Sequence, residues 1–255
     1  AALAGYLAGA GIELTGASGL TITLDALAIN LEQLGKGDLS TLAMDLNAGV
    51  DRLDAVLAET GERVSIENAT LGVRTPGVAR GVRVKAGNKF TLDGSPAGRI
   101  DADLTATDLL DPSGAPAQGL PSNVRGRIAL GGVRTAALGA FVPLPALDLP
   151  ADIGPVLNAE ATLTPRADAH TGIALTITSE HLNGTGALAI GADGLTGGDD
   201  ALVLELARVG PLLERVLNTP DAPGAIEAKT PGRVSLRAAN LALPLDPASL
   251  KTDGR

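Results

Sequence analysis

Cysteine is absent from the 255-residue chain, and aromatic residues make up only 1% of it, with no tryptophan. The absence of cysteine excludes a disulfide framework, thiolate metal ligands and a cysteine nucleophile. Because hydrophobic residues still account for 45% of the chain, leucine, isoleucine, valine and alanine must form its interior. Such a composition favours thin layers or a lining for lipid over a compact core anchored by large rings.

Basic residues are too few to suggest binding of nucleic acid. The net charge is −9, the isoelectric point is near 4.7, and no basic stripe interleaved with aromatics is present. An acidic chain repels phosphate backbones. The opening apolar run, which ends before Glu13, is shorter than the ~20 residues that span a bilayer. It starts without methionine or a basic region, so we expect a small-residue element or the trailing end of an excised anchor, not an intact signal peptide.

Alternation of apolar and polar residues predicts β-strands through most of the chain. Leu20, Ile22 and Leu24 alternate with two threonines and Asp25, and residues 98–107 alternate in the same way. The 33 glycines and 16 prolines fit many short strands joined by tight turns. We predict a mainly β fold with minor α: an elongated, curved antiparallel β-sheet, groove-like, built of repeated units with short capping helices.

The repeat is visible in residues 42–57 and 202–217, which lie 160 residues apart and share a pattern of alternation followed by an amphipathic run. The helical spacing of the apolar residues predicts a helix over 49–59 in the first copy and over 209–218 in the second. The apolar positions of the helix over 49–59 are Val50, Leu53, Val56 and Leu57.

A hairpin is also predicted around residues 86–88.

This repeat divides the chain into three parts. Residues 1–62 are interpreted as the end of a preceding repeat unit, with strands and the helix over 49–59. Residues 63–232 form a full unit of antiparallel strands with the helix over 209–218. Residues 233–255 are the start of the next unit and a tail.

Polar residues that could carry chemistry stand alone in the sequence. His170 and His181 have no metal-ligand spacing, and Ser179 lacks the context of a nucleophile elbow. Asp101 and Asp103 share a strand face and are expected to be solvated. The run 191–200 does not match a calcium loop and is interpreted as a hairpin turn. We therefore expect no catalytic residue, no metal, no cofactor and no enzymatic activity.

The remaining candidate is an aliphatic face in the second half of the chain. One interpretation is a core covered by the helices and by the proline-rich residues 135–155. The other is an apolar groove, partly open, that holds acyl chains. The candidate residues for contacting lipid are Ile173, Leu175, Ile177, Leu188, Ile190, Leu202, Leu204 and Leu206.

The pattern V-S-[IL]-x-x-A-x-L at Val64–Leu71 and Val234–Leu241 resembles the AsmA-like family of bacterial envelope proteins, which includes the TamB-like chains. The outward Thr/Asp alternation and the late strand leading into Gly210-Pro211-Leu212-Leu213 resemble that family too. The resemblance implies a long curved sheet with an apolar interior, a membrane helix near the N-terminus, a periplasmic location and a role in lipid passage and outer-membrane homeostasis. It implies no catalytic residues.

The leading functional hypothesis is a non-enzymatic envelope protein segment whose β-groove contacts lipid acyl chains, in lipid transport or outer-membrane homeostasis. The expected partner is a phospholipid or another acyl lipid, not nucleic acid. The expected location is the periplasm or cell envelope, with membrane attachment through a segment that this sequence lacks. The alternative is a structural or adhesive β-repeat surface protein with no ligand. Binding of calcium at Asp193, Asp199 and Asp200 would favour this alternative.

Overall fold

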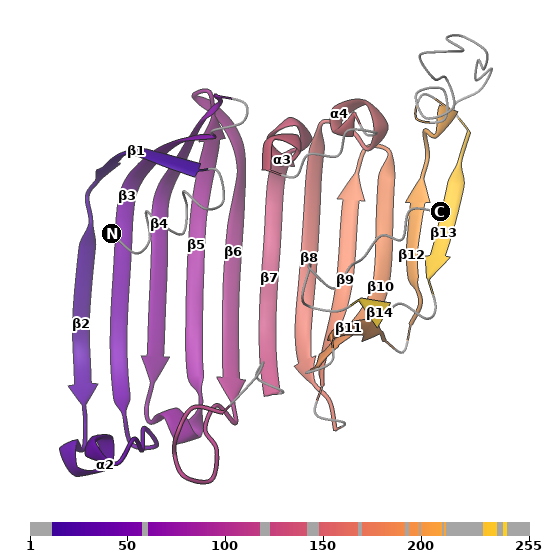
Figure 1. Cartoon of the computed structure of the whole chain (residues 1–255). Helices are drawn as coiled ribbons and strands as arrows, with labels where there is room; N and C mark the ends of the chain where they lie inside the picture. The colour runs from indigo at the N-terminus through magenta and orange to yellow at the C-terminus, as the bar shows by residue number, and fades with distance from the viewer. Residues whose placement is uncertain are drawn as a thin grey trace.

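A computed structural model describes residues 12–57, 61–117, 123–141, 148–167, 170–191, 194–198, 200–210, 212, 232–238 and 242–243. In these residues the chain is mainly β, with a few short helices (Figure 1). The first half contains β1 (Ile12–Ser18), β2 (Thr21–Ala28), α2 (Leu31–Gly35), β3 (Ala43–Leu57), β4 (Arg63–Thr75), the 3-10 turn η1 (Val78–Arg80), β5 (Val82–Leu92) and β6 (Ser95–Thr107). The second half contains β7 (Asn123–Arg134), α3 (Thr135–Phe141), α4 (Leu149–Asp152), β8 (Val156–Pro165), β9 (Thr171–Ser179), β10 (Leu182–Gly191), β11 (Gly194–Gly197), β12 (Leu202–Leu206), β13 (Val234–Ala238) and β14 (Ala242–Leu243).

All these strands belong to one antiparallel sheet. From β3 to β10 each strand pairs with the next one in the chain, so the sheet is a meander. The long strand β3 has two partners on its outer side, because β2 pairs with its first half and β1 with its second half. At the other end, β12 pairs with β10 and β13. The predicted fold class, a curved antiparallel sheet with short helices, is confirmed.

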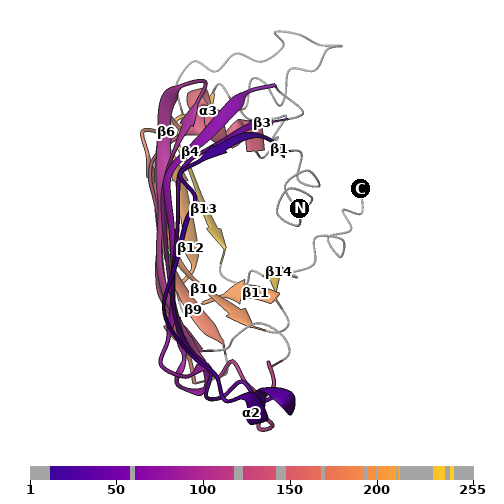
Figure 2. The ribbon, with the colours of Figure 1, turned by 90° about the vertical axis from the view of Figure 1, so that its left-hand side faces the viewer.

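The sheet is arched and open (Figure 2). The helices border its ends: α2 lies at the lower edge, and α3 and α4 lie at the upper edge (Figure 1). Each is brief, and α2 and α4 are capped at their N-termini by side chains. The Asn30 side chain accepts hydrogen bonds from the N–H groups of Glu32 and Gln33, and Asp148 accepts one from Ala151 at the start of α4. The described helices therefore leave most of both sheet faces uncovered.

The predicted helix over 49–59 is wrong, because β3 runs without interruption from Ala43 to Leu57. On β4, Glu67 and Thr70 pair with Lys89 and Gly87 of β5, which are two residues apart, so Glu67 and Thr70 share a face although they are three apart. Their partners on β3, Arg52 and Gly49, therefore share a face too. A β-bulge on β4 between Glu67 and Thr70, where Asn68 has a φ of 50°, causes this change of phase. The spacing of three residues between the apolar Val50 and Leu53 thus results from a bulge in the sheet and not from a helical turn.

Two other predictions have different outcomes. The hairpin around residues 86–88 is wrong, since β5 continues straight through them and the chain turns at Asp93 and Gly94. Most of the predicted helix over 209–218 lies outside the described residues. The division into repeat units at 62 and 232 stays a prediction, although the sheet continues across residue 62 through the pairing of β3 with β4.

The most closely packed region lies where α3 meets β6 and β7. Ala97, Val133 and Ala137 are fully buried there, and the Thr135 hydroxyl donates a hydrogen bond of 2.6 Å to the Gly154 carbonyl. Gly98 has a φ of 143°, and a Cβ at this position would lie 2.8 Å from both the Phe90 ring and the Val133 backbone. This small cluster stabilises the upper edge, and the described residues contain few other fully buried side chains.

Candidate functional site

One face of the sheet is lined by aliphatic side chains from edge to edge. Because directly paired residues in neighbouring strands share a face, the strand registers define continuous rows across the sheet. One row is formed by Leu24, Leu46, Val73, Val84, Leu104, Gly126, Leu163, Ile173 and Leu188. The adjacent row is formed by Ile22, Ala48, Leu71, Ala86, Ala102, Ile128, Ala161, Leu175 and Gly186. We call the surface of these two rows the apolar face.

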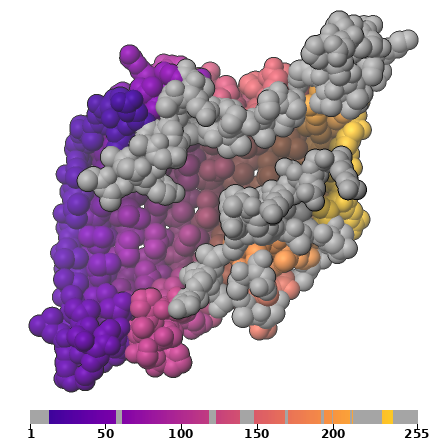
Figure 3. Space-filling view, viewed as in Figure 1, coloured from indigo at the N-terminus to yellow at the C-terminus, as the bar shows by residue number. Residues whose placement is uncertain are grey.

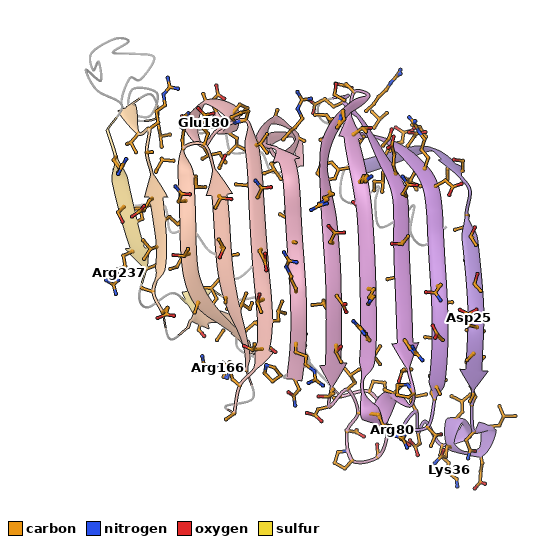
Figure 4. The ribbon with its side chains drawn as sticks, turned by 180° about the vertical axis from the view of Figure 1, so that it is seen from behind. Asp25, Lys36, Arg80, Arg166, Glu180 and Arg237 are labelled. Atoms are coloured by element: carbon orange, nitrogen blue, oxygen red, sulfur yellow. The ribbon has the colours of Figure 1, made fainter. Side chains whose placement is uncertain are left out.

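The apolar face lies on the concave side of the sheet. Seen from behind in Figure 4, the convex side carries polar side chains, including Asp25 on β2 and Arg237 on β13. Figure 2 shows that the opposite side, which faces the viewer in Figure 1, is the hollow of the arch. The space-filling view shows this side of strands β2 to β6 in indigo to magenta (Figure 3). The aliphatic rows therefore line a broad trough.

Exposure along the trough is uneven. Ile22 is 66% exposed, Leu24 48% and Leu71 41%, although side chains of this size are usually buried. At the far end of the row that contains Leu24, Leu188 is only 8% exposed. The trough is thus open over its N-terminal strands and better covered near β10.

The eight predicted lipid-contacting residues lie on the same side of the sheet as the apolar face, and Ile173, Leu175 and Leu188 belong to its two rows. Ile173 is paired with Leu188, and the row through Ile177 continues over Gly184 to Leu204. Apart from the buried Leu188, all of them are half-buried. They lie on β9, β10 and β12, the covered end of the trough: Ile173, Leu175, Ile177, Leu188, Ile190, Leu202, Leu204 and Leu206.

Sequence reasoning missed the more exposed half of the same face. Ile22, Leu24, Leu71 and Ile100 come from β2, β4 and β6 and are all more than one third exposed. The signal was present, since the same alternation that predicts these strands also assigns their apolar residues to one face. The sequence could not show that these strands join β9 and β10 in one sheet, because pairing is a tertiary property.

The convex face carries ladders of opposite charges. Arg83 on β5 donates two hydrogen bonds to Asp103 on β6, at 2.8 Å and 2.7 Å, and Arg127 on β7 pairs with Glu160 on β8 at 2.6 Å. The hydrogen bond from Arg83 holds the pKa of the Asp103 carboxyl below its ordinary value. Asp103 was expected to be solvated; its side chain is 43% exposed and also forms an ion pair with Arg83. These pairs give the convex face a surface suited to water.

A depression of about 720 Å³, lined by both polar and apolar residues, lies near the bend of β3 and β4. Its wall contains Asp54, which accepts hydrogen bonds from the Ser65 hydroxyl at 2.5 Å and from Arg52 at 2.8 Å. These two donors, the serine first, lower the pKa of the Asp54 carboxyl. The three side chains satisfy one another, as in a structural cross-strand cluster.

The remaining polar candidates are scattered. His181 lies 3.7 Å from Glu180 at the turn between β9 and β10, and His170 lies just before β9. The described residues contain no group of three His, Cys, Asp or Glu side chains that could hold a metal ion. Two of the three aspartates considered for calcium, Asp193 and Asp199, lie outside the described residues. None of the helices in the described ranges has the length and hydropathy needed to cross a bilayer.

The apolar trough is therefore the surface whose chemistry most needs an explanation. It offers dispersion contacts to a large apolar ligand, over an extent that single scattered leucines would not provide. Comparison with known proteins adds no assignment: no family model, curated protein or solved structure matches the chain.

Proposed function

We propose that this chain is a non-enzymatic segment of an AsmA-like (TamB-like) envelope protein, and that its concave face contacts the acyl chains of phospholipids or related lipids. The observation that carries the proposal is the continuity of the apolar face across β2 to β10, with large aliphatic side chains exposed over the N-terminal strands. A role in lipid transport or outer-membrane homeostasis, in the periplasm or cell envelope, follows from the family resemblance.

The chemistry of the surface supports an acyl chain over other ligands. The rows contain no charged residue, and their side chains are leucine, isoleucine, valine, alanine and glycine. A sugar ligand would be expected to meet aromatic platforms, which this chain almost lacks. Burying apolar surface contributes roughly 25 cal/mol per Å², so a chain lying along the trough gains affinity without any polar contact.

The dimensions also suit an extended chain. Neighbouring strands lie about 4.8 Å apart, so an acyl chain crossing the strands would contact roughly four or five of them. The open stretch from β2 to β6 contains five strands. A structural β-repeat protein without a ligand is expected to cover such a face, and the exposure of Leu24 and Leu71 therefore favours the lipid proposal over this alternative.

Native mass spectrometry tests the proposal. Protein purified without added lipid and then mixed with phospholipid should carry lipid-sized mass adducts. We expect Leu71→Lys to lower lipid uptake at least several-fold, because a charge in the trough must be desolvated when an acyl chain covers it. The matched control is Thr70→Lys, since Thr70 is also exposed but its side chain belongs to the opposite face.

Equal uptake by both variants would show that lipid does not occupy the apolar face. A homogeneous lipid-free mass, with no uptake when lipid is supplied, would contradict the proposal itself and favour the structural alternative. Circular dichroism of each variant shows whether the fold is kept, so that a loss of uptake can be attributed to the trough.

A further inference from the structure

Each end of the sheet has a strand with a free edge. At one end β2 pairs only with β3, and at the other β13 pairs only with β12 among the described strands. Every residue of β2 is exposed, and on β13 Leu236 is 62% exposed. The unpaired N–H and C=O groups of such edges are a template for another strand.

The two edge strands run in the same direction. The path from β2 through β3 to β10, and on through β12 to β13, consists of ten pairings, all antiparallel. An even number of reversals restores the original direction, and both arrows point downward in Figure 1. A second copy placed beside the first by translation would therefore set its β13 parallel to β2, with the concave faces on the same side.

The side chains of the two edges match in one register. When Val234 is level with Ile22, Leu236 is level with Leu24, and these apolar residues share the concave side. In the same register Arg237 is level with Asp25 on the convex side. Neither charge forms an ion pair within the described residues, although Asp25 accepts a hydrogen bond from Asn47 at 3.0 Å. Figure 4 shows the two at opposite ends of the sheet.

Repulsion between like charges disfavours the pairing of two identical edges, β2 with β2 or β13 with β13. Two antiparallel β2 strands would bring two copies of Asp25 near each other, and two β13 strands would do the same with Arg237. The register of unlike edges instead joins opposite charges and places Val234 and Leu236 beside Ile22 and Leu24 on the concave side. A β-bulge between Leu24 and Ala26 interrupts β2, so regular pairing is confined to Thr21–Leu24.

We propose that copies of this chain associate end to end, with β13 of one copy added to β2 of the next, so that the sheet and its trough continue from copy to copy. The contact is heterologous, so it does not close on itself and produces a graded series of oligomers. It is a short parallel junction, which is less stable per residue than an antiparallel one. We therefore expect reversible association at roughly micromolar concentrations or above.

Analytical ultracentrifugation of the full chain without lipid tests this inference. The weight-average mass should rise with concentration beyond that of a dimer. Asp25→Arg and Arg237→Asp should each lower the association constant by about tenfold, equivalent to 1.4 kcal/mol, and the double variant carrying both changes should recover most of it. Glu180→Arg is the control for Asp25→Arg. It makes the same charge change, from acidic to basic, at an exposed turn away from both edges (Figure 4).

A constant monomer mass would overturn the inference, as would association that both single variants leave unchanged. A dimer that does not grow further would indicate pairing of like edges and would also contradict it. Ile22→Lys provides a second test at an exposed edge position and should reduce association without unfolding the chain. Because no lipid is present, failure here leaves the lipid proposal untouched.

Discussion

Leu204 on β12 lies directly opposite Gly184 on β10, and its Cδ2 atom is 2.7 Å from the point where a Cβ of residue 184 would be. Leu204 therefore fills the space that the glycine leaves on the concave side. Two residues further along β10, Gly186 faces the backbone of Leu202, whose Cα lies 2.5 Å from the corresponding point. Both glycines permit close approach of β12. Gly184 faces a side-chain atom, which can move by itself, whereas Gly186 faces backbone atoms, which move only with the strand.

Alanine at these two positions should therefore have unequal effects. Gly186→Ala should reduce the free energy of unfolding by about 1–3 kcal/mol, because the backbone of β12 must shift to admit a methyl group. Gly184→Ala should cost less than about 1 kcal/mol, since the Leu204 side chain can change rotamer. Urea denaturation followed by far-UV circular dichroism measures both. A greater loss at residue 184 would contradict the described packing of β10 against β12.

The turn between β5 and β6 depends on left-handed backbone conformations. Asp93 has a φ of 46° and Gly94 a φ of 76°, and the Asp93 side chain accepts a hydrogen bond from the Arg63 N–H at 3.1 Å. Gly94→Ala should lower stability by about 1 kcal/mol, because a Cβ disfavours this region. Gly35→Ala, in α2, has open space and no positive φ, so it should be neutral or stabilising. Thermal unfolding of the two variants compares them directly.

The pair of Arg83 and Asp103 predicts a pH-dependent stability. The pKa of Asp103 is lowered in the folded protein, so its contribution is present above the unfolded pKa of about 3.9 and is lost as pH falls through the folded value. Asp103→Asn should lower the unfolding midpoint at pH 7, and the difference from wild type should shrink at acidic pH. Both side chains are exposed, so the effect should be small.

A double-mutant cycle separates this pair from its surroundings. Arg83→Gln should have a similar effect at neutral pH, and the double variant should lose less than the sum of the single variants. Added salt should weaken the coupling. Strict additivity at low salt would show that the contact between the two strands does not contribute to stability.

The two ends of the trough should tolerate a charge differently. Leu188→Lys should destabilise the fold by about 3 kcal/mol or more, because Leu188 is buried and a charge there loses its hydration. Leu71→Lys should change stability by less than about 1 kcal/mol, since the side chain can remain in water. Chemical denaturation tests this contrast. Similar losses at both positions would show that the N-terminal strands are covered in solution.

Local pattern was sufficient to predict much of the fold. The alternation at Leu20–Asp25 and over residues 98–107 predicts strands, and the structure has β2 and β6 at these places. It failed over residues 49–59. There a bulge on the neighbouring strand β4, at Asn68, changes the face to which β3 side chains point, and no local pattern in β3 contains this information.

The apolar face could be predicted only in part. Ala86 of this face was expected in a hairpin turn, whereas sequence alone assigns the eight candidates on β9, β10 and β12 to an apolar strand side. Their assembly with Ile22, Leu24 and Leu71 depends on the order in which the strands pair. The difference in exposure between Leu71 and Leu188 depends on which part of the chain lies over each strand, a relationship between segments far apart in sequence.

The sequence by itself determined the two-sided character of this protein. A strand has a side-chain period of two, so alternating residues must separate an aliphatic side from a charged one wherever strands form. The tertiary structure decided that these sides join into a single arched sheet, with the aliphatic side inward and both edges unpaired among the described strands. Strand order, bulges and twist set the curvature, and these arise from contacts between strands that no single segment encodes.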